Sequence, residues 1–312
     1  MTASTRWAIG DRQPFISKRI FRIALEFDVV RPSGIDEAVD AVEDGGIPVA
    51  GGTYLMPRIH LRMVRPSVLV DLSGLRGDMG YVAVDGDYLR IGALATISDL
   101  MRARIPGGME SLRAAASKFG SPQIREMATV GGNLATASAH ADLITVFEAL
   151  DARVKLRGRR GERMVKLGKL YRAGGLELRP GELLSEIFVE MPRGDHRTSF
   201  EKIGRRASNC PAVVNAAVYM EMDPSSGRVV DVRIATNAIG PGVPGRAKAA
   251  ESELRGRKFT DDSLSNAMSA LDGELKPGDD FMASASYRRM AAKSIIAGLL
   301  RRSAEEIAGG AA

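Results

Sequence analysis

Two short segments with paired glycines constrain the fold of this chain more than any other feature. The first consists of Val49, Ala50, Gly51, Gly52, Thr53, Tyr54 and Leu55. The second consists of Thr129, Val130, Gly131, Gly132 and Asn133. Because glycine has no Cβ, its main chain can approach an anion closely, and consecutive N–H groups can cradle a diphosphate. The neighbouring Thr53 and Asn133 add hydroxyl and amide donors.

Each glycine pair has a second interpretation, as a tight turn with no ligand. Short glycine motifs often match by chance, so either pair alone leaves both interpretations open. The sequence contains no G-x-x-x-x-G-K-[ST] motif, and a P-loop is therefore not predicted. Two separated cradles would suit a dinucleotide better than a mononucleotide.

The composition is that of a globular protein. The chain has 312 residues, 45% of them hydrophobic and 26% charged, which predicts two or three packing units. No apolar run of about 18 residues occurs, so no membrane span is expected. The N-terminus does not resemble a secretory signal, and we expect a cytoplasmic protein. The single cysteine, Cys210, excludes an internal disulfide and an iron–sulfur cluster held by this chain's own thiolates.

The net charge of +6 does not predict a nucleic-acid partner. The basic residues are scattered along the chain, and only 5% of residues are aromatic, which leaves few side chains for base stacking. We expect a solvated basic surface or a docking surface for acidic partner proteins. The three histidines, His60, His140 and His196, are too dispersed to predict a metal site.

Hydrophobic periodicity divides the chain into regions of different rhythm. Ordered structure is expected to begin near residue 21. The first predicted helix has Ser33 as its N-cap, with Asp36 at the capping-box position. A second capping box is predicted at Thr96 and Asp99. Strands are predicted over 47–50, 68–72, 81–84, 88–93, 153–157 and 183–191, and helices over 110–119 and 142–150.

The last region has long strand patterns followed by helical patterns. The strands are predicted over 198–205, 212–222 and 229–238, and the helices over 246–254, 260–272 and 284–302. Strands that precede helices indicate an α+β unit with an antiparallel sheet.

Several segments, taken in order, resemble one known family. They are VAGGTYLMPRIHLRMVRPSVLVDLSGL, RIGALATISDL, SPQIREMATVGGNLATASAHADL, FEKIGRRA and SASYRRMAAKSI. Together they are similar to the FAD-binding medium subunits of the xanthine dehydrogenase and carbon monoxide dehydrogenase family, the molybdenum hydroxylases. The likeness runs from Phe27 to Tyr287.

The resemblance implies an α+β fold. It consists of a two-subdomain FAD-binding fold of the vanillyl-alcohol-oxidase type, followed by a C-terminal α+β domain with an antiparallel sheet. We expect an N-terminal arm over 1–20, an FAD-binding domain over 21–195 with subdomains of about 21–80 and 81–195, and a C-terminal domain over 196–312.

The resemblance also implies a non-covalent FAD site. The residues from Val49 to Leu55 would form the first diphosphate cradle, and those from Thr129 to Asn133 the second. Thr136 and Asp142 would add polar contacts, Phe119 would lie near the flavin ring, and Leu184 would pack against the cofactor. Lys202 would place positive charge near the flavin and favour its anionic reduced form. Tyr54 stands where the family more often has a small or polar residue, which narrows the first cradle.

Four of the singled-out side chains have plainer interpretations. Phe119 suits the core, and Lys202 suits a solvated strand position. Asp142 suits a helix N-cap. Cys210 suits buried packing better than nucleophilic chemistry.

The implied function is that of a flavoprotein subunit, an FAD-dependent oxidoreductase chain with no catalytic residue or metal of its own. FAD would pass electrons from a partner Fe–S small subunit to an acceptor, which is NAD, a quinone or oxygen. Molybdopterin and the [2Fe-2S] clusters would belong only to partner subunits, with molybdopterin in the large one. The alternative is a stand-alone FAD-binding protein of the same fold, either an independent flavoenzyme or a non-redox scaffold.

Overall fold

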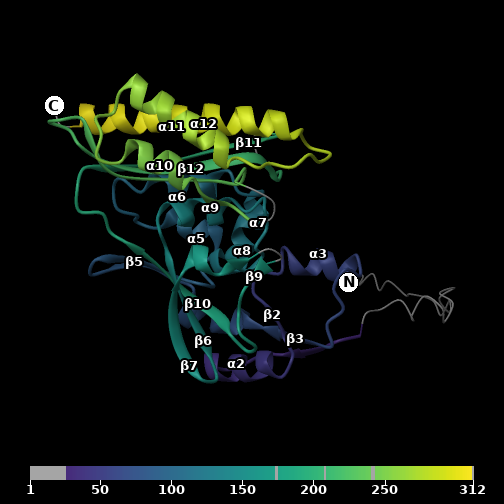
Figure 1. The fold of residues 1–312 in the computed structure, drawn as a ribbon. Coiled ribbons are helices and arrows are strands. Elements are labelled where there is room, and N and C mark those ends of the chain that lie inside the picture. The colour runs from purple at the N-terminus through teal and green to yellow at the C-terminus, as the bar shows by residue number, and fades with distance from the viewer. Residues whose placement is uncertain (1–25, 173–174, 207–208, 240–242, 311–312) are drawn as a thin grey trace, which may run out of the picture.

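The computed structural model describes residues 26–172, 175–206, 209–239 and 243–310 (Figure 1). The predicted arm over residues 1–20 lies outside the described residues, as does the predicted start near residue 21. No helix in the described ranges is long and apolar enough to cross a membrane.

The first sheet is small and parallel. Its strands are β1 (Asp28–Val30), β3 (Val68–Asp71) and β2 (Ile47–Val49), in that order across the sheet. Helix α2 (Ile35–Glu43) connects β1 to β2 and buries Ala38 and Val39, and α3 (Leu55–His60) follows β2. Parallel strands need such crossover connections, which explains the alternation of strand and helix along this part of the chain.

The predicted cap of α2 is wrong. Gly34 occupies the N-cap position and makes no side-chain cap, so Asp36 is the second helical residue and Glu37 the third. Glu37 instead accepts hydrogen bonds from the Ser33 backbone N–H (2.7 Å) and hydroxyl (2.8 Å). The helix therefore begins one residue later than the capping-box pattern predicts.

The second sheet is antiparallel and has five strands. In order across the sheet they are β4 (Val82–Asp85), β5 (Tyr88–Gly92), β10 (Leu183–Glu190), β6 (Arg153–Gly158) and β7 (Gly161–Lys166). The β4–β5 hairpin, β6 and β10 confirm the sequence prediction. A short pair, β8 (Tyr171–Arg172) and β9 (Gly175–Leu176), lies apart from this sheet.

Short helices follow the β4–β5 hairpin and form a layer of their own. They are α5 (Ile97–Arg102), α6 (Glu110–Ser117), α7 (Pro122–Met127), α8 (Val130–Ala135) and α9 (Asp142–Ala149). The predicted capping box at Thr96 and Asp99 is confirmed. Three shorter elements are η1 (Leu72–Leu75), α4 (Arg76–Met79) and η2 (Leu167–Lys169).

The C-terminal region is a four-stranded antiparallel sheet covered by helices. The strands are β11 (His196–Gly204), β12 (Ala212–Asp223), β13 (Arg228–Thr236) and β14 (Gly245–Arg246), and the helices are α10 (Lys248–Leu254), α11 (Asp261–Glu274) and α12 (Ala285–Gly309). These elements agree with the predicted order of strands and then helices. The α+β fold class is confirmed.

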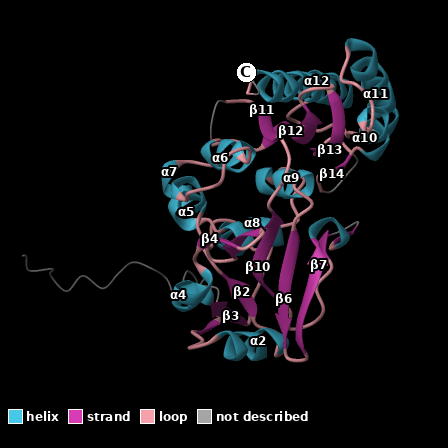
Figure 2. Ribbon diagram, turned by 90° about the vertical axis from the view of Figure 1, so that its left-hand side faces the viewer, coloured by secondary structure: helices cyan, strands magenta, loops and turns pink. Residues whose placement is uncertain are grey.

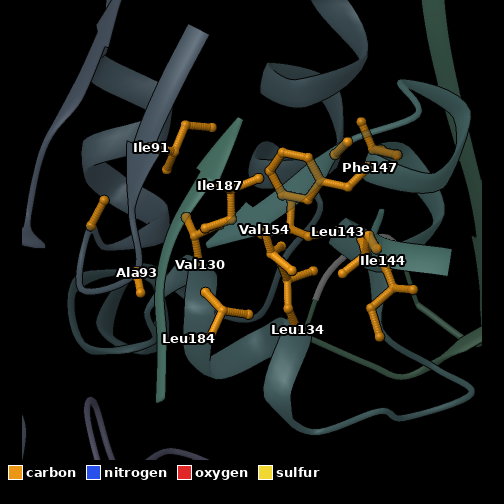
Figure 3. Packing of buried hydrophobic residues seen from close by; sticks show 14 of the residues in the cluster. Ile91, Ala93, Val130, Leu134, Leu143, Ile144, Phe147, Val154, Leu184 and Ile187 are labelled. Atoms are coloured by element: carbon orange, nitrogen blue, oxygen red, sulfur yellow. The ribbon is translucent and has the colours of Figure 1, made fainter. Parts of the chain in front are cut away.

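Helix α9 joins the two halves of the molecule. It lies in the layer between the five-stranded and four-stranded sheets, and every one of its residues is buried (Figure 2). Phe147, Leu143 and Ile144 belong to the same buried cluster as Ile187, Val154 and Leu184 of the five-stranded sheet (Figure 3). The opposite side of α9 contacts β12 and β13. Most of the surface of α9 is apolar, and its three buried polar residues, Asp142, Thr145 and Glu148, lie along one side of the helix.

Candidate functional site

The structure brings the two glycine segments together. A Cβ on Gly51 would overlap the carbonyl oxygen of Met127, the last residue of α7. Met127 is separated from Thr129, where the second segment begins, only by Ala128. Glycine is therefore required at position 51 because two stretches of backbone touch there.

The first segment offers free backbone donors. Among the described residues, no hydrogen bond uses the backbone N–H groups from Gly51 to Leu55. Gly52 has a φ of +69°, which turns the chain sharply into α3. Successive N–H groups around such a turn form a concave anion site. The geometry fits the predicted diphosphate cradle.

The second segment is a capped helix and not a loop. Thr129 is the N-cap of α8, and its Oγ1 accepts the N–H of Gly132 at 3.1 Å. Val130 and Gly131 donate their N–H groups to Ala95 and Ala93, at 2.8 and 2.9 Å. The N–H of Asn133 donates to the carbonyl oxygen of Thr129. These backbone donors are therefore already used inside the protein, unlike those of the first segment.

The second segment presents side chains instead. Within the part of the chain that the structure describes, the Oδ1 atom of Asn133 is buried and has no hydrogen-bond partner. Buried amide oxygens almost always have a partner, so this atom is a candidate acceptor for a donor from a ligand. Thr136 lies one turn further on, and its hydroxyl donates to the carbonyl oxygen of Asn133 at 2.7 Å.

Leu184 and Phe119, the two apolar side chains predicted to contact the cofactor, differ in burial. Leu184 of β10 is 9% exposed and lies beside Val130 and Leu134 in the core (Figure 3). Phe119 follows α6, is half-buried, and packs against the edge of the same core. Arg125 donates to the carbonyl oxygen of Phe119 at 3.0 Å and fixes the turn that carries it.

Lys202 and Asp142 form a buried ion pair. The Lys202 Nζ lies 2.5 Å from Asp142 Oδ2, and their side chains are 6% and 4% exposed. The interpretation of Lys202 as a solvated strand residue is therefore wrong. Asp142 is not the N-cap of α9 either, because Ala141 holds that position. Lys202 also donates toward the carbonyl oxygen of Lys118, at 3.4 Å.

The charge of this pair depends on its surroundings. Burial raises the pKa of Asp142, because desolvation penalises the carboxylate. The ammonium of Lys202 and the amide of Asn215 oppose that rise by stabilising the charged form. Asn215, in β12, was not predicted from the sequence. The available signal was a lone amide inside the apolar run of residues 212–222.

Two other predicted positions lie at the surface. Tyr54 is 39% exposed, and the guanidinium of Arg58 stacks on its ring at 3.4 Å. Cys210 lies outside β12 and is half-buried, and its thiol donates to the carbonyl oxygen of Arg206 at 3.2 Å. The interpretation of Cys210 as buried packing holds only in part, because the residue is half-buried and precedes β12, which begins at Ala212.

Two cavities elsewhere in the molecule are alternative candidates for a binding site. One cavity of about 200 Å³ includes Tyr88, Phe188 and Arg233 in its lining. Another, of about 290 Å³, includes Tyr81 and Glu186. Neither is lined by the glycine segments. Within the described ranges, no group of three or more histidine, cysteine, aspartate or glutamate side chains is arranged to hold a metal ion.

Family models match nearly the whole chain. Residues 25–192 match the FAD binding domain in molybdopterin dehydrogenase. Residues 198–303 match the CO dehydrogenase flavoprotein C-terminal domain.

Known proteins agree with these matches. The glyceraldehyde dehydrogenase medium chain of Sulfolobus acidocaldarius is 29% identical, over 86% of this chain and 95% of its own length. The carbon monoxide dehydrogenase medium chain of Afipia carboxidovorans is 30% identical, over 90% and 96%. The structure of reconstituted CO dehydrogenase from Oligotropha carboxidovorans superposes with a TM-score of 0.84 at 28% identity, covering 89% of this chain and 98% of the other.

The similar proteins are named as medium chains and subunits of larger dehydrogenases, which favours the subunit interpretation over a stand-alone flavoprotein. The family matches, the fold and the free donors beside Gly52 point the same way. The chain belongs to the family of FAD-binding medium chains of the molybdenum hydroxylases, and it is an oxidoreductase subunit.

Proposed function

We propose that FAD binds non-covalently with its diphosphate on the segment from Val49 to Leu55. The observation that carries this proposal is the run of unused backbone N–H groups from Gly51 to Leu55. An anion with several oxygens satisfies such a run better than any neutral group. The segment from Thr129 to Asn133 takes part through its side chains, and the orphaned Oδ1 of Asn133 accepts a donor from the cofactor.

The remaining contacts belong to the same proposal. Thr136 and Asp142 border the site with polar groups, and Phe119 and Leu184 line it with apolar surface. Lys202 supplies a positive charge held by Asp142. A cation next to a redox group favours the state that carries more electrons. The FAD domain would extend over 21–195, with subdomains 21–80 and 81–195, and the C-terminal domain over 196–312, which the two family matches support.

In this proposal the chain is an electron carrier within a larger complex. When bound, FAD supplies an acceptor for electrons and passes them on. An Fe–S small subunit would deliver the electrons, and a molybdopterin large subunit would oxidise the substrate. The final acceptor would be NAD, a quinone or oxygen, and the complex would work in the cytoplasm. The single cysteine supports this division of labour, since an Fe–S cluster normally needs about four thiolates.

A pair of glycine variants tests the diphosphate site. Gly52→Val is expected to reduce FAD affinity by at least tenfold, because a branched side chain crowds the cradle and disfavours its left-handed turn. The matched control is Gly86→Val in the β4–β5 hairpin, where φ is also positive (+56°) and a Cβ would meet open space. Titration of each variant with FAD, followed by fluorescence quenching, measures the affinity. Equal losses in the two variants would place the diphosphate elsewhere.

A further inference from the structure

A line of buried hydrogen bonds lies behind the Lys202–Asp142 ion pair. Asn215 is fully buried, and its Nδ2 donates to Asp142 Oδ1 at 3.0 Å. The other carboxylate oxygen, Oδ2, accepts from Lys202 at 2.5 Å. Asp142 is thus held between an amide and an ammonium, with one oxygen committed to each.

The sheet register fixes the positions of Lys202 and Asn215. The two residues are directly paired across β11 and β12, so their side chains emerge on the same face of the sheet. That face turns toward α9, where Asp142 is the first residue. A slip of one residue in either strand would turn one of the two side chains to the opposite face.

The orientation of the Asn215 amide is fixed as well. Thr145, one turn after Asp142 on α9, donates its hydroxyl to Asn215 Oδ1 at 2.8 Å. The Asn215 backbone N–H donates to Asn237 Oδ1 at 2.9 Å, and its carbonyl oxygen accepts the Thr236 hydroxyl at 2.8 Å. With its oxygen taken by Thr145, the amide must present its NH₂ group to Asp142.

This arrangement fixes the position of the Lys202 side chain. The Asn215 NH₂ group and the Lys202 Nζ each donate to a separate oxygen of Asp142, so the carboxyl group holds Lys202 in one orientation. The ammonium has three N–H donors, and only Asp142 and the Lys118 carbonyl oxygen accept from it among the described residues. One N–H remains for a ligand.

We infer that Asn215 is a positioning residue that acts through Asp142 to keep the Lys202 side chain aimed at the flavin, and so raises the flavin reduction potential. This inference rests on the proposed function, in which FAD lies beside Lys202. It assigns a role in the redox site to Asn215 of β12, whose side-chain amide is bonded to Thr145 and Asp142.

The test compares the reduction potential of FAD in variants of the full chain. Asn215→Leu keeps the bulk of the side chain and removes the donor to Asp142. We expect the preference for reduced over oxidised FAD to fall about tenfold, in line with the loss of one charge-assisted hydrogen bond. For a two-electron couple, tenfold corresponds to a potential lower by about 30 mV. Asn237→Ala is the control, because it weakens the anchoring of the Asn215 backbone and leaves the amide donor in place.

A second variant covers the case in which Asn215→Leu does not fold. Thr145→Val conserves shape and removes only the hydroxyl that orients the amide, so the potential should fall in the same direction by a smaller factor. If folded Asn215→Leu or Thr145→Val has the potential of the Asn237→Ala control, the inference is overturned while FAD binding stands. If the wild-type chain binds no FAD, the proposed function itself fails and the inference fails with it.

Discussion

Glu148 is a buried carboxyl group on α9, and its Oε1 atom has no hydrogen-bond partner among the described residues. Burial raises the pKa of Glu148 to about 7. The positive charges of Arg246 and Lys248 lower this pKa and the negative charge of Asp151 raises it, but desolvation is the largest effect. In the unfolded chain the same group titrates near its ordinary value of 4.5. The folded protein therefore binds a proton that the unfolded chain has lost between these two pH values.

The consequence is a defined pH dependence of stability. A raised carboxyl pKa leaves folding unaffected below about pH 4.5 and destabilises the fold as pH rises toward 7. The full effect is on the order of 3 kcal/mol, since each pKa unit corresponds to about 1.4 kcal/mol. Glu148→Gln should remove it. Denaturation of both proteins by urea should give similar stabilities at pH 4.5 and a more stable variant at pH 8. If the difference in unfolding free energy between the variant and the wild type is the same at pH 4.5 and pH 8, the raised pKa of Glu148 is contradicted.

At the scale of elements, α8 is a helix that its own sequence does not favour. It begins with Val130, Gly131 and Gly132, which are weak helix formers. The Thr129 cap and the hydrogen bonds to Ala93 and Ala95 hold it in place. A Cβ on Gly131 would come within 2.6 Å of Ala93, so glycine there serves close packing within the protein.

The cap of α8 can be tested directly. Thr129→Ala is expected to lower the free energy of unfolding by about 1 kcal/mol and to weaken FAD binding, because Asn133 moves with the helix. Thr129→Ser keeps the oxygen that accepts the Gly132 N–H and should retain both properties. Thermal denaturation and FAD titration measure the two effects. An alanine variant as stable as the serine variant would show that tertiary contacts alone hold α8.

The elements also show what the sequence could and could not predict. The long strand β12 agrees with its predicted range nearly to both ends, because its apolar pattern extends over many residues. The start of α12 also agrees, but this helix continues to Gly309, beyond the predicted end at residue 302. Helix α8 was missed because its stability comes from tertiary bonds. Strand β7 was missed because it is a polar edge strand in which charged residues outnumber apolar ones. The Ser33 prediction failed by a shift of a single position.

In the candidate site, too, the sequence predicts residue types but not the contacts that depend on the fold. The residue types of the glycine segments and of Lys202 could be recognised from sequence patterns and family resemblance. Which donors are free could not, because that depends on which backbone groups meet in space, such as Gly131 and Ala93. Asn215 could not be predicted either, since its role comes from the register between β11 and β12.

In the molecule as a whole, α9 links the C-terminal sheet to the region in which we propose that FAD binds. Helix α9 has its buried faces against both large sheets, and its first residue holds Lys202 (Figure 2). In the proposed site, the C-terminal region would supply Lys202, and the N-terminal region would supply the diphosphate cradle. We therefore expect the two regions to unfold in a single cooperative transition, and not as separate units.

Retention of FAD by the purified full chain tests whether this protein carries a flavin. The purified protein, incubated with FAD and passed through a desalting column, should retain about one FAD per chain and release FAD, and not FMN, on acid treatment. Excess FAD should also raise the melting temperature, since a ligand at about 100 times its Kd stabilises a protein by roughly 2.7 kcal/mol. A chain that remains colourless and gains no thermal stability from excess FAD would contradict the account.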